Sequence, residues 1–457
     1  MSCRVDYRTI PHMPRDGLLR LAVAFLCCRA CSTATLLERA TAVLRGPTTS
    51  APKTSHRPGF VRVADDGLRF AVDCDPFYVA GFNSYTLIEA AAEVQSGGSY
   101  SVNYTGGRQL VLSQLDEAQR SGLNVVRMWA FTVMASRPMQ IAPGLYDEDL
   151  SRGLDFVLAA ARARSIRVVL VLADWWTPTG GVSQYLKWSK SAWPASPLFA
   201  FYTDSDCRAM FKQNAAHWIN RVNSINGITY KDDSTIFGWE LLNEGRCPRG
   251  CGASMQHWIA DMADYIAALD PHHLRSVGEE GFFSSNVQWG VGTVAEPGIW
   301  ARTTGQSFTD DHAPAAITHA TAHIWPQDWS PFAPLGPVTL DPINFVRDFI
   351  TSHAKVCQTL RKPLIISEYG CSAGIIDSAF TSFTRSAFYA TVHSAVEEGI
   401  LAGLPIAGDL LWIWYAQSTR VADSFGVYTD QPVWQQIVAH ASTLNALANE
   451  KRGSFCP

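Results

Sequence analysis

Residues 236–244 read IFGWELLNE, and this stretch decides how the rest of the chain is interpreted. It is an apolar run with large side chains that ends in an amide and a carboxylate, Asn243 and Glu244. This pattern is typical of a buried parallel strand whose carboxyl end opens into an active site. A second run of the same form, PLIISEYG, contains Glu368 near its end. Two such strands predict a pair of carboxylates that face one substrate bond; the alternative is two ordinary helix-capping glutamates.

The composition is that of a soluble globular protein of 457 residues, with 47% hydrophobic and 17% charged residues. This length is enough for one large barrel or for two medium domains. The formal net charge of -4 argues against a nucleic-acid partner. The 15 Trp, 14 Tyr and 22 Phe suit flat apolar faces that stack on sugar rings, although most of them will belong to the core.

The N-terminus is predicted to be separate from the fold. Residues 18–28, LLRLAVAFLCC, form an apolar segment that is too short to span a membrane stably. We therefore expect a signal or targeting peptide over residues 1–34, a disordered leader over 35–58 and a catalytic domain over 59–457. This organisation predicts a secreted protein of the extracellular space or cell wall, a monomer with no membrane partner. An organelle transit peptide is the alternative.

The cysteine distribution is consistent with export. Four of the eleven cysteines lie in the leader, and the seven that remain are an odd number, so at least one thiol is free or paired outside the chain. Cys247 and Cys251 are close enough to form a disulfide in an oxidising compartment. Zinc is the alternative for this pair, but no second Cys or His pair stands at a suitable spacing. Asn103 begins a glycosylation sequon, Asn-Tyr-Thr, in a Gly/Ser-rich stretch.

Short apolar runs alternate with longer amphipathic ones along the rest of the chain. The expected strands are residues 77–83, 124–131, 167–176, 236–244, 275–281, 317–325, 363–370 and 408–415. The clearest helical patterns are residues 110–121, 149–164, 207–225 and 255–269. Eight such βα units predict an α/β protein with a single (β/α)8 barrel, in which the chemistry lies at the carboxyl ends of the strands. Glu244 then belongs to strand four and Glu368 to strand seven.

The residues at the predicted strand ends form the candidate site. They are Asn83, Arg127, Trp129, Asn243, Glu244, Glu280, His323, Trp325, Glu368 and Trp412. Three other tempting groups are given less weight. His272 and His273 precede a strand and are expected in a turn, Asp310 begins a solvated cluster in a long loop, and Asp174 either lines the cleft or makes a structural hydrogen bond.

Several motifs in barrel order resemble a known family. NVVRMWAF, WELLNEGRC, HIWPQDW and SEYG are similar to segments of glycoside hydrolase family 5, the cellulase family, and in particular of its endo-β-1,4-mannanases. The resemblance extends over roughly residues 59 to 450 and includes less catalytic stretches such as TYKDDSTIFGWELLNE and DPHHLRSVGEEGF. It implies a mannan endo-1,4-beta-mannosidase that acts on mannan, galactomannan or glucomannan and needs no metal or organic cofactor.

The resemblance also implies roles for individual residues. Glu244 matches the general acid/base of the family, Glu368 its nucleophile, and Arg127 the arginine that keeps the nucleophile ionised. Trp412 matches the aromatic platform under the sugar, and Arg246 the arginine that contacts sugars on the leaving-group side. The implied substrate-binding residues are Arg127, Trp129, Asn243, Arg246, His323, Trp325 and Trp412.

The chain departs from the family pattern at two positions. Trp325 stands where the family usually has a tyrosine that donates a hydrogen bond to the nucleophile, and its indole N–H is expected to replace that donor. Gly245 stands where proline is common, so the loop after Glu244 is expected to be looser.

The chemistry implied by the two carboxylates is glycoside hydrolysis with retention of configuration. It requires one acid to protonate the leaving oxygen and one carboxylate, about 5 Å away, to attack the anomeric carbon. A related glucanase, an exo-acting mannosidase and a transglycosylase are the alternatives within the enzyme class. A carbohydrate-binding protein without turnover is the alternative outside it, and the presence of both carboxylates and Arg127 argues against it.

Overall fold

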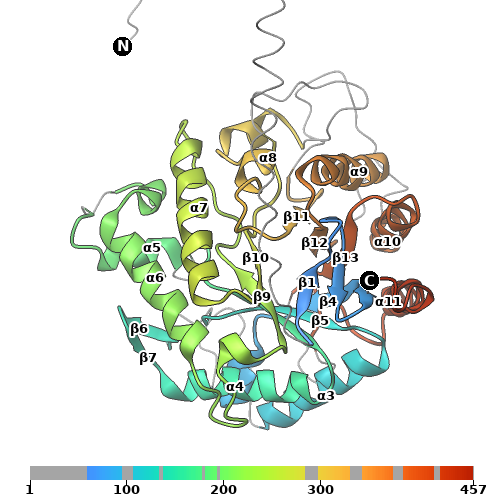
Figure 1. Cartoon of the computed structure of the whole chain (residues 1–457), viewed down its shortest axis with the longest axis horizontal. Coiled ribbons are helices and arrows are strands. Elements are labelled where there is room, and N and C mark those ends of the chain that lie inside the picture. The colour runs from blue at the N-terminus through green and yellow to red at the C-terminus, as the bar shows by residue number, and fades with distance from the viewer. Residues whose placement is uncertain are drawn as a thin grey trace, which may run out of the picture. The chain divides into compact units, whose positions relative to one another are not determined.

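Eight parallel strands form one sheet that curls into a nearly closed barrel (Figure 1). In spatial order the strands are β10, β9, β8, β5, β4, β13, β12 and β11. Their bounds are β4 Val79–Asn83, β5 Val125–Trp129, β8 Arg167–Val171, β9 Ile236–Glu240, β10 Leu274–Ser276, β11 Ala320–Ile324, β12 Leu364–Tyr369 and β13 Ile406–Leu411. The two edge strands approach each other, because the Thr318 amide donates to the Arg275 carbonyl (2.9 Å) and the His323 amide to the Glu280 carbonyl (3.1 Å). The predicted (β/α)8 barrel is confirmed.

The computed structural model describes residues 59–94, 106–132, 137–177, 181–192, 196–283, 297–329, 342–373, 384–415 and 423–455. The predicted signal segment, the predicted leader and the Asn103 sequon lie outside the described residues. None of the helices within the described residues is long and apolar enough to cross a membrane.

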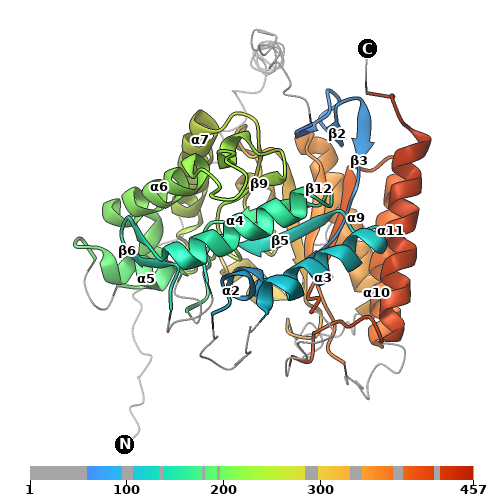
Figure 2. The same cartoon turned by 90° about the horizontal axis from the view of Figure 1, so that it is seen from below.

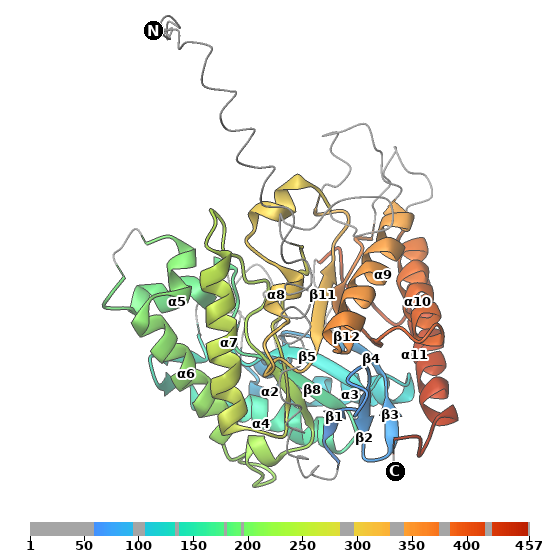
Figure 3. The ribbon, with the colours of Figure 1, turned by 45° about the horizontal axis from the view of Figure 1, so that its top comes forward.

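Helices surround the barrel on its outer face (Figure 1). They are α2 Leu87–Ala92, α3 Gly107–Arg120, α4 Glu148–Arg162, α5 Gly181–Trp188, α6 Ser205–Asn220, α7 Gly252–Leu269, α8 Phe308–Asp311, α9 Pro342–Leu360, α10 Arg385–Leu401 and α11 Pro432–Glu450. The side chains of Asp147 and Asp204 cap α4 and α6 by accepting bonds from first-turn amides, which such helix ends otherwise leave unpaired. Helices α9, α10 and α11 lie side by side, with α10 in the middle (Figure 3).

A small antiparallel sheet closes the end of the barrel opposite the candidate site. Its strands are β1 Val61–Val63, β2 Phe70–Val72 and β3 Asp75–Phe77, and β3 lies near one end of α11 (Figure 2). Phe70 packs edge-on against Phe237 of β9, with ring centroids 5.3 Å apart. The remaining elements are the hairpin of β6 Gln140–Ala142 and β7 Leu145–Tyr146, and the 3-10 turns η2 Leu198–Tyr202, η3 Tyr230–Asp232 and η4 Ile299–Thr303.

Most strands are shorter than the apolar runs suggested. Strand β9 ends at Glu240, so Glu244 lies four residues beyond it rather than inside it. Residues 241–244 still bond to the neighbouring chain segments on both sides: the Asn243 amide donates to the Ala173 carbonyl, after β8, at 2.9 Å, and the Glu244 amide donates to the Gly278 carbonyl, after β10, at 2.7 Å. The apolar pattern continues past the strand because residues 241–244 remain buried. Periodicity alone does not distinguish a buried segment of this kind from a regular strand.

The structure contains the predicted disulfide between Cys247 and Cys251. The zinc alternative for this pair is wrong, since both sulfur atoms are used in the bond. Among the described residues Cys207, Cys357 and Cys371 are free and buried, which confirms the prediction of at least one free thiol.

Candidate active site

Arg127 is the centre of the candidate site. It lies on β5, is fully buried, and donates from Nη1 to Glu368 Oε1 (2.5 Å) and to Asn83 Oδ1 (2.9 Å). From Nη2 it donates to Glu240 Oε1 (2.5 Å) and to Asn243 Oδ1 (2.8 Å). Burial alone would lower the pKa of the guanidinium, but the two carboxylates outweigh it and raise this pKa, so Arg127 is a permanent cation.

A β-bulge in β12 directs Glu368 into the barrel. Ala322 of β11 pairs with Ile366 and His323 pairs with Glu368, so Ser367 is an extra residue between the two pairs. Side chains of a regular strand alternate between its two faces, and a bulge resets this alternation. Burial raises the pKa of Glu368, whereas the Arg127 guanidinium opposes this shift.

Glu244 has its two carboxyl oxygens bound by different donors. Trp176 Nε1 donates to Oε2 at 2.6 Å, and His323 Nδ1 lies 2.7 Å from Oε1. Burial raises the pKa of Glu244, and the bond from Trp176 lowers it. The backbone of Glu244 has a φ of 50°, in the left-handed region, so the surrounding contacts hold this residue in a conformation that few non-glycine residues adopt.

The lack of a side chain at Gly278 leaves room for the Glu240 carboxylate. Its φ is 92°, and a Cβ there would lie 2.5 Å from Glu240 Oε1. Glycine therefore permits both the turn after β10 and the approach of Glu240 to Arg127.

The carboxyl groups of Glu244 and Glu368 share one small space. One oxygen of each, together with a nitrogen of His323, lies within 4.8 Å of the others. Two carboxyl groups this close do not both ionise readily, so the pair holds one proton over a wide range of pH. Burial favours the protonated form of both groups and Arg127 favours the ionised form of Glu368, so the pair can hold one acid beside one carboxylate.

The same three side chains would also satisfy the distance requirement of a metal site. However, Arg127 already binds Glu368, and Trp176 and His323 bind Glu244. Burial lowers the pKa of His323 to about 3, so the imidazole is neutral, and its Nδ1 is hydrogen-bonded to Glu244. With these oxygens paired to a cation and to N–H donors, the site is suited to proton transfer rather than to cation binding.

Aromatic side chains line the site beside the carboxylates. Trp412, which follows β13, stacks on Tyr85 with ring centroids 5.7 Å apart. Trp129 lies 6.1 Å from Trp412 and packs under the Arg127 guanidinium at 4.8 Å. Trp325 meets Trp412 edge-on at 6.0 Å. Such a surface can stack on the apolar faces of sugar rings.

Arg246 lies near Glu244 and is held there by a different carboxylate, that of Glu280. It forms a two-point ion pair with Glu280, with distances of 2.8 and 2.5 Å, and its guanidinium lies 5.0 Å from the centre of the Trp176 ring. Burial and the neighbouring Glu244 raise the pKa of Glu280 to about 7. Trp176 is 39% exposed, so this pair forms part of the accessible wall next to Glu244.

The loop after Glu244 is held at several points, and the looser loop expected from Gly245 stays a prediction. Gln306 Nε2 donates to the Gly245 carbonyl (2.9 Å), the Cys247 amide donates to the Thr304 carbonyl (2.6 Å), and the disulfide closes the loop. A Cβ at Gly245 would lie 3.0 Å from the Tyr202 hydroxyl. Tertiary contacts therefore hold the loop despite the backbone freedom of glycine.

Comparison with known proteins shows the family of this chain. Residues 58–435 match the family described as GH family 5 beta-mannosidase-like. The chain belongs to this family. It is 31% identical over 398 residues to Mannan endo-1,4-beta-mannosidase 7 of Arabidopsis thaliana, covering 86% of this chain and 85% of the relative. It is 33% identical over 358 residues to Mannan endo-1,4-beta-mannosidase 1 of Oryza sativa subsp. japonica, covering 78% of each. The endo-1,4-beta-mannanase structure from Rhizomucor miehei superposes with a TM-score of 0.67 at 26% identity, covering 85% of this chain and 99% of that one.

In this family 5 protein the tertiary structure brings most of the predicted residues together. Arg127, Asn243, Glu244, His323 and Glu368 are linked by direct contacts, and Trp129 packs on Arg127. Trp325 and Trp412 are among the aromatic side chains that line the site, and Arg246 contacts the accessible Trp176.

Sequence reasoning missed two residues of the site, Glu240 and Trp176. Glu240 lies inside an apolar run, and a buried acid at that position was a signal that a cation lies opposite it. Trp176 lies in a loop whose conformation the sequence does not reveal. Asp174 itself accepts a bond from Asn243 Nδ2 at 3.0 Å, the structural hydrogen bond that was one of its two expected roles.

Replacing Trp176 with phenylalanine is expected to shift the alkaline limb of the pH profile of kcat/KM upward by about one unit or more. The bond from Trp176 stabilises ionised Glu244, so without it the pKa of Glu244 rises and the acid stays protonated to higher pH. Trp188→Phe, on α5, is the matched control. An alkaline limb that does not move would contradict the role of this bond.

Trp325 does not donate to Glu368 in the described structure, which corrects the expectation from the sequence. Its ring packs edge-on against Trp412 and Phe425, and the side-chain donor to Glu368 among the described residues is Arg127. We expect Trp325→Phe to raise KM on mannan and to leave the acidic limb of the pH profile in place. An upward shift of the acidic limb would indicate that Trp325 does donate a hydrogen bond to Glu368.

Proposed function

We propose that this protein is a retaining endo-β-1,4-mannanase that acts by double displacement. The observation that carries the proposal is the buried pair of Glu244 and Glu368, whose oxygens lie within 4.8 Å of each other. Retaining glycosidases place their two carboxyl groups about 5–5.5 Å apart, whereas inverting enzymes need roughly 6.5–9.5 Å to admit a water. The names of the relatives supply the linkage and the polysaccharide.

In the first step Glu368 attacks the anomeric carbon while Glu244 donates its proton to the glycosidic oxygen. The bond between the anomeric carbon and that oxygen breaks, and an ester bond to Glu368 forms with inverted configuration. In the second step ionised Glu244 takes a proton from water, whose oxygen attacks the same carbon and releases Glu368. The second inversion restores the β configuration.

The other residues support these two steps. Arg127 keeps Glu368 ionised and oriented. Neutral His323 donates to Glu244 and stabilises its carboxylate after the proton has left. Trp412 is the platform for the sugar at the bond that is cleaved, and Arg246 with Trp176 contacts the sugar on the leaving-group side.

A panel of polysaccharides tests the proposal. The full chain is incubated with linear mannan, galactomannan, glucomannan and cellulose, and the products are sized. We expect internal cleavage of the mannans to short oligosaccharides, with a β anomer formed first in proton NMR. Release of mannose alone would indicate an exo-acting enzyme, and cleavage of cellulose alone a glucanase. A first-formed α anomer would contradict the double displacement.

The proposed site of action is the extracellular space or the cell wall. The support for it is the apolar segment 18–28 near the N-terminus, which is typical of a secretory signal. A reporter fused after residue 58 tests this. Appearance of the processed reporter in the medium or wall fraction supports secretion, and retention inside an organelle contradicts it.

A further inference from the structure

The β-bulge in β12 must stay at one position along the strand for Glu368 to face the barrel interior. Ile366, before the bulge, pairs with Asp409 of β13, and Tyr369, after it, pairs with Leu411. Two residues of β12, Ser367 and Glu368, therefore oppose one residue of β13. Shifting the bulge by one residue toward the end of the strand would turn Glu368 from the barrel interior to the helical layer.

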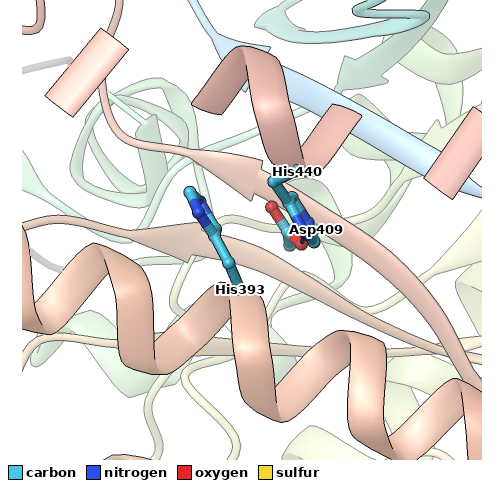
Figure 4. Close-up of side chains that lie close together, drawn as sticks. All are labelled: His393, Asp409 and His440. Carbon is cyan, nitrogen blue, oxygen red and sulfur yellow. Dashed lines mark hydrogen bonds and ion pairs between the residues drawn. The ribbon is translucent and has the colours of Figure 1, made fainter. Parts of the chain in front are cut away.

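Side chains on the outer face of β12 and β13 connect the two sides of this bulge. The Tyr369 hydroxyl donates to Asp409 Oδ1 at 2.7 Å, and His393 Nε2 of α10 lies 3.1 Å from the Tyr369 oxygen. Because the single hydroxyl proton points to Asp409, the Tyr369 oxygen accepts from His393, which carries its proton on Nε2. Figure 4 shows His393 and Asp409 facing each other between α10 and β13.

A second histidine completes the network from α11. His440 lies next to Asp409 (Figure 4), with Nε2 2.7 Å from Asp409 Oδ2. Its Nδ1 lies 2.6 Å from Glu397 Oε1. Both ring nitrogens face carboxylates, so both carry protons and His440 is a cation. Tyr369, His393, Asp409 and His440 are all buried. We refer to these four residues as the buried network.

The ligand atoms of His393, Asp409 and His440 lie within 4.8 Å of one another, but the arrangement does not suit a metal ion. The two imidazole rings are stacked, with centroids 4.2 Å apart and planes at 3°. The lone pair of an imidazole nitrogen lies in the ring plane, and two parallel planes share no point at which one ion could sit. Each ligand atom also has a hydrogen-bond partner already.

We propose that the buried network positions the nucleophile: it locks the bulge of β12 and thereby holds Glu368 in the barrel. The inference rests on the proposed role of Glu368. The bond from Tyr369 to Asp409 joins the residue that directly follows Glu368 to the residue opposite Ile366, and so spans the bulge. A shifted bulge would pull Tyr369 away from Asp409 and break this buried hydrogen bond. The register in which Glu368 faces outward is therefore less stable than the observed one.

The test compares two equivalent substitutions in buried tyrosines. Tyr369→Phe removes the hydroxyl that spans the bulge. Tyr230→Phe removes a hydroxyl that donates to a different buried carboxylate, Asp155, at the same distance of 2.7 Å but away from the catalytic strands. The readouts are kcat and KM on mannan, and the rate at which an activated 2-deoxy-2-fluoro-β-mannoside labels the nucleophile, with the labelled residue identified by mass spectrometry.

We expect Tyr369→Phe to lower both kcat and the labelling rate by about tenfold to 100-fold, because small displacements of a reacting group have such effects, while KM stays nearly constant. Tyr230→Phe should lose comparable thermal stability and keep both rates. Equal rates in Tyr369→Phe and the wild type would overturn the inference.

Two further outcomes are distinguishable. If the wild type cleaves no mannan, or if the label is not on Glu368, the proposed function fails rather than the positioning role. If Tyr369→Phe does not fold, Asp409→Leu takes its place. It removes the acceptor of the bond that spans the bulge, while His440 keeps its pairing with Glu397. A reduced labelling rate then supports the inference, and an unchanged rate overturns it.

Discussion

Replacing Glu368 with alanine is expected to lower kcat/KM on mannan on the order of 10⁵-fold, because the covalent intermediate cannot form. The fold should persist, since Arg127 keeps its ion pair with Glu240 and its bonds to two asparagines. Steady-state kinetics and thermal unfolding of the purified variant measure the two properties. Near-normal activity on mannan would show that Glu368 is not the nucleophile.

Azide rescue separates the roles of the two glutamates. With an activated aryl mannoside, azide can enter the space vacated in Glu368→Ala and attack from the same side, giving an α-mannosyl azide. In Glu244→Ala the leaving group needs no acid, so the intermediate forms and azide replaces water in the second step, giving a β-mannosyl azide. An exposed glutamate, Glu398, provides the matched control, and Glu398→Ala should behave like the wild type. The opposite pattern of anomers would exchange the two assignments.

Replacing Arg127 with methionine is expected to have the largest effect on stability, a loss of about 3–5 kcal/mol in the free energy of unfolding. The substitution leaves the buried carboxylates of Glu240 and Glu368 without their cation. We also expect kcat/KM to fall by about 100-fold or more. The acidic limb of the pH profile should move upward, since loss of the cation raises the pKa of Glu368 and keeps it protonated to higher pH.

A double variant distinguishes the structural from the catalytic contribution of Arg127. Arg127→Met with Glu240→Gln removes one of the two unpaired charges, so it should recover part of the lost stability but not the activity. Arg221→Met is the control, because Arg221 also pairs with a buried aspartate, Asp155, but away from the site. It should lose stability and keep kcat. Recovery of activity in the double variant would mean that Arg127 has only a structural role.

The amino-acid sequence determines the barrel and the two carboxylates to a large extent. Buried parallel strands must be apolar along most of their length, so eight apolar runs were recognisable without a structure. An ionisable residue at the end of such a run is costly unless it has a partner or a function, which marked Glu244, Glu368 and Arg127. Strand ends were less predictable, because the burial of residues 241–244 outlasts the regular strand β9.

Only the tertiary structure decides which partners these residues have. Trp176 reaches Glu244 across 68 positions of sequence, and Glu240 reaches Arg127 across 113. The bulge at Ser367 has no local signature, since it depends on how β11 and β13 pair with β12. The pairing with β11 and β13 thus sets which side chains of β12 face the barrel interior. The buried network that spans the bulge also contains residues of α10 and α11. That two glutamates and an arginine reach one end of a barrel follows from the local pattern of apolar and ionisable residues, whereas the directions in which they point depend on contacts between segments far apart in the chain.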